Sequence, residues 1–66
     1  MGTSIEKVIL AIIALNGEQV LAGGGAPVFI AKDIEQQQRT AFLLEKILDG
    51  IAHDLENGIL IIVRHW

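Results

Sequence analysis

The sequence predicts a small α/β (α+β) domain of two layers, with the element order α-β-β-α-β, a three-stranded mixed sheet and a long second helix. Two segments, 4–15 and 34–57, carry apolar residues at helical spacing, and each ends at an Asn-Gly pair. Two further runs, 28–31 and 59–63, are apolar at every position, which is typical of strands that are covered on both faces. A chain of 66 residues is long enough for one core, so residues 1–66 are expected to form a single domain.

The first segment, 4–15, is predicted to be a helix. Thr3 and Glu6 have the spacing of a capping box, which satisfies two free N–H groups at a helix start. The apolar residues that follow recur three and four positions apart: Ile5, Val8, Ile9, Ile12 and Leu15. Because several of them are β-branched, a strand is the alternative.

The segment after the first helix is predicted to be a β-hairpin. Residues 18–22 have the composition of a short strand, and residues 23–27 form a glycine-rich loop. The second strand covers residues 28–31, and Pro27 suits its start because proline has no N–H to donate there.

The second helix is predicted over residues 34–57, with Asp33 as N-cap and Gln36 at the capping-box position. Without a break it would be roughly 36 Å long, nearly twice a typical strand. Gly50 lies inside it, so a kink or break at that residue is the alternative. As a crossover, this helix would make strands 28–31 and 59–63 parallel.

Composition excludes several classes of function. The net charge of −3 and the five scattered basic residues argue against nucleic-acid binding, which needs clustered positive charge. No cysteine is present, so thiolate metal sites and cysteine nucleophiles are excluded. The apolar run at 8–15 is far shorter than the ~20 residues that span a bilayer, and Glu6 and Lys7 precede it without a signal-peptide cleavage site after it. We therefore expect a cytoplasmic protein without membrane contact.

The polar residues near the end of the chain give no catalytic pattern. Arg64 and His65 follow an apolar run, as in histidine phosphatases, but Trp66 stands where that motif has glycine, so they are interpreted as the end of a strand. Asp49 and His53 would share a face of the long helix, but two ligands are too few for a typical metal site. The sequence predicts no enzyme, no metal and no cofactor.

A glycine-rich loop provides the candidate ligand site. Gly23, Gly24 and Gly25 could present backbone N–H groups to an anion, with Lys32 nearby in the sequence. The loop lacks the P-loop pattern, because a strand rather than a helix follows it. Binding of a small anionic metabolite, as a sensor protein would bind it, is therefore the alternative function.

The leading prediction is a small, non-catalytic regulatory or protein-interaction module that acts as a homodimer. Two helices cannot easily cover both faces of strands 28–31 and 59–63 together with the excess turns of the long helix, and a domain this small usually needs disulfides, metals or association. The residues expected at the interface are Phe42 and Leu43, which widen the apolar arc of the helix, with Glu45, Ile61 and Trp66. Glu45 is expected at the rim of the apolar stripe, with its stem along apolar surface; the alternative is a carboxylate at the subunit interface, paired with Arg39 or Arg64. The expected partners are a second copy of the chain and another protein.

Overall fold

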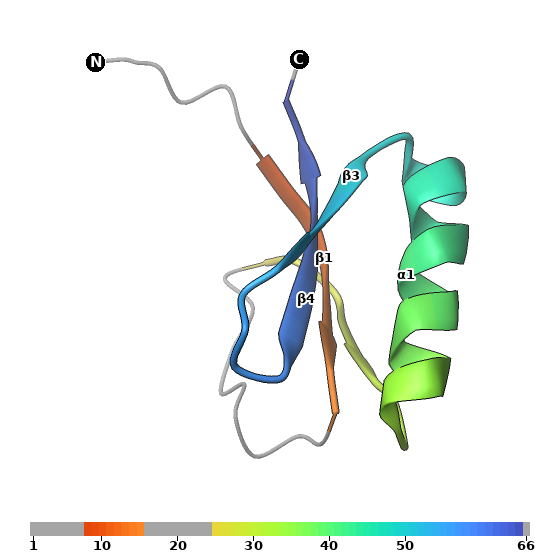
Figure 1. Ribbon diagram of the computed structural model, residues 1–66. Coiled ribbons are helices and arrows are strands. Elements are labelled where there is room, and N and C mark those ends of the chain that lie inside the picture. The colour runs from red at the N-terminus through yellow and green to blue at the C-terminus, as the bar shows by residue number, and fades with distance from the viewer. Residues whose placement is uncertain (1–7, 16–24, 66) are drawn as a thin grey trace.

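The computed structural model describes residues 8–15 and 25–65 and shows one helix packed on a four-stranded sheet (Figure 1). The two-layer α/β class is therefore confirmed, with four strands in place of three. The elements in chain order are β1 (Val8–Ala14), β2 (Val28–Ile30), α1 (Ile34–Leu48), β3 (Ile51–Asp54) and β4 (Ile59–Arg64).

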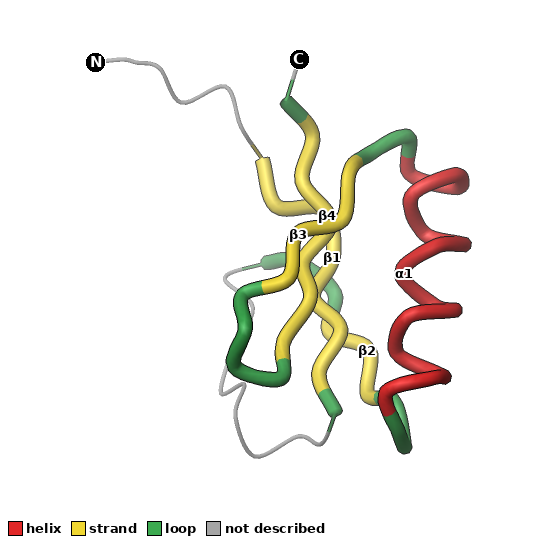
Figure 2. Tube along the Cα trace, viewed as in Figure 1, coloured by secondary structure: helices red, strands yellow, loops and turns green. Residues whose placement is uncertain are grey.

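The sheet is mixed, with the strand order β2-β1-β4-β3. β1 pairs with β2 in parallel and with β4 antiparallel, and β3 pairs with β4 antiparallel. The helix connects the two edge strands, β2 and β3 (Figure 2). The predicted parallel pairing of strands 28–31 and 59–63 is wrong, because β1 lies between them and β4 runs in the opposite direction to β2.

β1 occupies the segment predicted to be the first helix, so that prediction is wrong and its alternative, a strand, is confirmed for residues 8–14. β1 is a central strand with a neighbour on each side, and Ala11, Ile13 and Ala14 are fully buried. A run with apolar residues at every position suits this place, because both faces of a central strand can be covered. A bulge between Ile9 and Ala11 shifts the pairing with β4.

The predicted second strand at 28–31 is confirmed as β2, with three residues. Its predicted hairpin partner at 18–22 lies outside the described residues. In the described part of the chain, β2 pairs with β1: Ile12 N–H donates to Pro27 O at 2.9 Å, and Ala31 N–H donates to Ala14 O at 2.8 Å.

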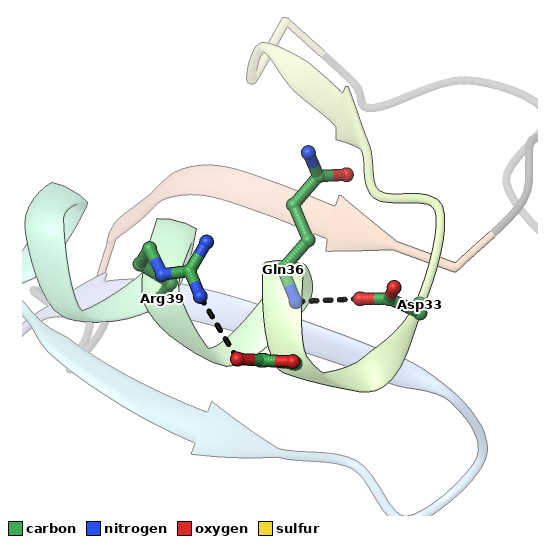
Figure 3. A network of polar contacts seen from close by, with 4 residues as sticks. Asp33, Gln36 and Arg39 are labelled. Atoms are coloured by element: carbon green, nitrogen blue, oxygen red, sulfur yellow. Dashed lines mark hydrogen bonds and ion pairs between the residues drawn. The ribbon is translucent and has the colours of Figure 1, made fainter.

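The predicted start of the long helix is confirmed at α1. Asp33 is the N-cap, and its Oδ1 accepts a hydrogen bond of 2.8 Å from the Gln36 N–H (Figure 3). The Gln36 side chain reaches back and accepts from the Lys32 N–H at 2.7 Å, so two backbone N–H groups at the helix entrance are satisfied. On the exposed side of the helix, Glu35 and Arg39, four residues apart, form an ion pair at 3.0 Å.

The predicted end of that helix at residue 57 is wrong, and the alternative of a break near Gly50 is confirmed. α1 ends at Leu48, and Asp49 adopts the left-handed conformation, with φ 59° and ψ 50°. The next residue, Gly50, donates its N–H to Glu45 O at 3.1 Å, which closes the last turn. The chain then enters β3 at Ile51, which gives the sheet its fourth strand.

Gly50 is required for close packing rather than for its backbone angles. A Cβ at this position would lie 2.7 Å from Ile62 Cγ2 and 3.1 Å from both Leu10 Cδ1 and Val63 O. Ile62 is fully buried, so its side chain has little room to move. The absence of a side chain therefore lets the helix-to-strand turn lie directly on β4.

The core lies between α1 and one face of the sheet, and among the residues that the structure describes it contains one buried polar side chain, Gln37. Its Nε2 donates to Ile13 O at 3.0 Å and to Gly58 O at 2.9 Å, so the helix is bonded to β1 and to the residue before β4. A buried amide with two partners avoids the penalty of an unsatisfied polar group. The apolar core residues around it are Ala11, Ile13, Ala31, Ala41, Leu44, Leu60 and Ile62.

We predict that Gly50→Ala lowers the free energy of unfolding by about 1–3 kcal/mol, because the added methyl group overpacks the contact with Ile62. In an unbroken helix the same substitution would stabilise the protein by about 1 kcal/mol. Urea unfolding followed by circular dichroism measures the sign. A stabilised variant would contradict the helix-to-strand turn.

Candidate interaction surface

The two faces of the sheet differ in what covers them. In β4, Leu60 and Ile62 belong to the core under α1, so the alternate residues Ile59, Ile61 and Val63 point to the opposite face. No helix or strand of the described residues covers that opposite face, which lies on the side of the sheet away from α1 (Figure 1).

The pairing register identifies the side chains that share this uncovered face. One row crosses all four strands: Val28 pairs with Ile12, Ile12 with Ile61, and Ile61 with His53. One further row lies on each side of it. We call the whole set the open face; its residues are Ile9, Ile12, Ala14, Val28, Ile30, Ile51, His53, Ile59, Ile61 and Val63. Ala14 and Val63 are buried within this set, so its accessible apolar surface comes from the other residues.

The open face is apolar except for its histidine. Its outer residues are the most exposed, with Ile30 at 55%, Ile9 at 48% and Ile51 at 44% of their full accessible surface. The central residue Ile61 is half-buried between its neighbours on β1 and β3. Contiguous apolar surface on a small protein is typical of a site that binds another protein.

The residues predicted to lie at an interface are only partly brought together. Ile61 is at the centre of the open face, whereas Phe42 and Leu43 lie exposed on α1, in the other layer. Lys46 Nζ lies 4.6 Å from the centre of the Phe42 ring, in a cation–π contact. Trp66 lies outside the described residues. No finding tests the interface role of these residues, so it stays a prediction.

Glu45 bonds to the backbone within its own chain. Its carboxylate Oε2 accepts a 2.6 Å hydrogen bond from the Ala52 N–H, and Arg39 pairs with Glu35. Among residues 8–15 and 25–65 of the single chain, Glu45 forms no ion pair with Arg39 or Arg64, and a pair across a subunit interface stays a prediction. In the structure, Glu45 connects the last turn of α1 to the edge strand β3.

The β3–β4 hairpin also brings together two residues that the sequence analysis kept apart. The Nε2 atoms of His53 and His65 lie 2.8 Å from each other, and the ring centres are 5.0 Å apart. His65 follows Val63 by two residues, which places both rings on the side of the open face. The predicted pairing of Asp49 with His53 on one helical face is wrong because the helix ends before both residues.

The signal that could have identified this pair is the turn before β4. Asn57-Gly58, interpreted as the end of a three-residue hairpin loop over 56–58 rather than as a helix stop, gives the register that aligns residue 53 with residue 61; the Leu55 N–H donates to Ile59 O across this loop. Arg64 ends β4 and His65 follows it, so the prediction of a strand end is confirmed.

The structure describes two of the four residues of the predicted anion site, Gly25 and Lys32. Gly25 has a φ of +98°, which glycine adopts readily, and Lys32 is exposed beside the N-cap of α1. Gly23 and Gly24 lie outside the described residues, so the anion site stays a prediction.

Residues 6–65 match the family described as "Capping complex subunit for YIEGIA". The chain belongs to this family. It is also 44% identical, over the full 66 residues of both chains, to the "Uncharacterized protein YpzH" of Bacillus subtilis (strain 168). No solved structure matches the chain.

The match to the YIEGIA capping-subunit family includes every strand of the open face and the whole of α1. Within the described residues, no helix is long and apolar enough to cross a membrane. In the same residues, no three side chains of the metal-binding types converge.

We predict that Glu45→Ala lowers the free energy of unfolding by about 1–3 kcal/mol, because the Ala52 N–H loses a charged acceptor. Glu45→Gln keeps an oxygen that can accept the hydrogen bond, so this variant should lose less free energy of unfolding than Glu45→Ala. Urea unfolding of both variants measures the difference. Equal stability of Glu45→Ala and the unchanged protein would contradict a structural role for this bond.

Proposed function

We propose that this chain is a non-catalytic protein-interaction subunit, and that it joins the complex named for YIEGIA by docking its open face against its partner there. The observation that carries this proposal is the open face itself: four strands present aliphatic side chains on the side that α1 leaves uncovered. The family to which the chain belongs is described as a complex subunit, which supports the same role.

The chemistry of the open face favours a protein as its ligand. Its single polar side chain is His53, at one edge, and the central row is otherwise formed by Val28, Ile12 and Ile61. Small polar metabolites are held by several convergent polar groups, which this surface does not offer. Burying the open face against an apolar face of a partner protein is favourable, by roughly 25 cal/mol per Å² of apolar area removed from water.

The dimensions of the face indicate how much of a partner it can hold. The four strands have 7, 3, 4 and 6 residues, and at about 3.3 Å per residue and 4.8 Å between strands they give a surface of roughly 320 Å². Two such faces bury roughly 640 Å² together, below the 1,200–2,000 Å² typical of stable interfaces. This supports a partner that extends beyond the sheet, and it makes a dimer through the open face alone a weak one.

A homodimer is the second candidate, and the exposed apolar residues of α1 favour it. Phe42 and Leu43 are 57% and 50% exposed, and Ile47 is 71% exposed. A second copy that covered these residues would leave the open face available to the other partner. We also propose that the subunit is regulatory and acts in the cytoplasm, as expected from its sequence.

We predict that Ile30→Lys prevents binding to YIEGIA, because a lysine on the open face would have to be desolvated or displaced on docking. The experiment is co-expression of the tagged chain with YIEGIA from the same cell, followed by co-purification. Ile47→Lys is the matched control, since it introduces the same charge at a more exposed isoleucine on the helix.

The oligomeric state of the purified chain tests the second candidate, the homodimer. Light scattering of the purified chain should give twice 7.2 kDa if a homodimer forms, with a melting temperature that rises with concentration. Loss of YIEGIA binding in Ile47→Lys but not in Ile30→Lys would contradict docking by the open face and assign the partner to the helix.

A further inference from the structure

The two histidines of the chain, His53 and His65, meet at one point. They come from opposite sides of the β3–β4 hairpin, and their Nε2 atoms lie 2.8 Å apart. In the register of the hairpin, the pair formed by Ile51 and Val63 lies between them along the strands. The two rings therefore converge over an apolar part of the sheet rather than over charged residues.

We propose that His53 and His65 together bind a divalent transition metal ion through their Nε2 atoms. Imidazole nitrogen is a preferred ligand of Zn²⁺, Ni²⁺ and Cu²⁺. The chain has no cysteine, so these two nitrogens are its strongest ligands for such ions.

The distance between the two nitrogens fits this role. A metal–nitrogen bond of about 2.0–2.1 Å and an angle of 90–110° at the metal place two ligand nitrogens roughly 2.9–3.4 Å apart. The observed 2.8 Å needs an opening of only a few tenths of an ångström, which small rotations about χ1 and χ2 supply. Backbone pairing of β3 with β4 holds His53 in place before the ion arrives, and His65 directly follows the last residue of β4, so little ordering is needed on binding.

The site provides two ligands, so water or a group of a bound partner completes the coordination. Among the described residues, no carboxylate forms an ion pair with either imidazole. The ion would therefore lie at the rim of the open face with coordination positions still available. A metal bound there adds positive charge beside an otherwise apolar surface.

The alternative is a hydrogen-bonded histidine pair with no metal affinity, in which one neutral imidazole donates to the other. Thermal unfolding with excess Zn²⁺ distinguishes the two. Zn²⁺ that binds only the folded chain should raise the melting temperature by about 5 °C or more, and EDTA should reverse the rise. Mg²⁺, which prefers oxygen ligands, should have no effect.

Two variants and one spectroscopic measurement make the test specific. His53→Gln and His65→Gln should each abolish most of the Zn²⁺-dependent rise, because either change removes one of the two ligands. Glu45→Gln, which leaves both imidazoles, should retain the rise. In nitrogen-15 NMR of the unchanged protein, Zn²⁺ should shift both Nε2 resonances together.

The proposal is overturned if Zn²⁺ changes neither the melting temperature nor the Nε2 resonances. It is also overturned if the rise persists in both histidine variants, since the ion would then bind elsewhere. If a variant fails to fold, the NMR titration of the unchanged protein decides: a joint shift of both Nε2 resonances supports the site, and a shift of one or neither rejects it.

Discussion

The turn at Asp49–Gly50 is the constraint on which the rest of the molecule depends. Two residues carry the chain from the end of α1 to the start of β3, so one must take a left-handed conformation and the other must lie against β4 without a side chain. If the helix continued past this point, β3 would not exist. The sheet would lose an edge strand, and the open face would lose Ile51 and His53.

The elements that local chemistry determines could be predicted from the sequence. Asp33 and Gln36 have hydrogen-bonding side chains at the spacing that a helix start requires, and the structure uses both. Strand 59–63 is apolar throughout and could hardly lie anywhere but in a sheet. Each of these predictions depends on a few neighbouring residues, whose interactions are independent of the rest of the fold.

The elements that tertiary packing determines could not be predicted in this way. Residues 8–14 fit a helix by spacing and a strand by composition, and the choice depends on whether β2 and β4 are available as neighbours. Ile51 and Leu55 continue the helical spacing of α1, yet the chain turns at Gly50. Glycine in a helix weakens it by only about 1 kcal/mol, so spacing alone could not reveal that the contact with Ile62 decides the outcome.

The candidate surface also has some features that could be predicted from local sequence and others that depend on tertiary packing. An excess of apolar surface could be predicted, since a strand without polar positions needs cover on both sides, and Ile61 was correctly placed on such a strand. The contact between His53 and His65 could not, because it exists only once β3 pairs with β4 in one register. Helical numbering instead placed His53 beside Asp49.

The bond between Glu45 and Ala52 has a consequence for how copies of this chain meet one another. Leu55 donates its N–H to Ile59 O, so odd-numbered residues of β3 bond to β4 and the even-numbered Ala52 directs its N–H outward. Outward N–H groups on an exposed edge are templates on which a strand from another molecule can add, and repeated addition produces fibrils. The Glu45 carboxylate already occupies this one, and its negative charge repels the carbonyl oxygen of an incoming strand. A protein whose helix leaves an aliphatic face of the sheet uncovered thus has one outward N–H of its β3 edge occupied by a side chain of that helix, which makes strand addition at this edge less favourable.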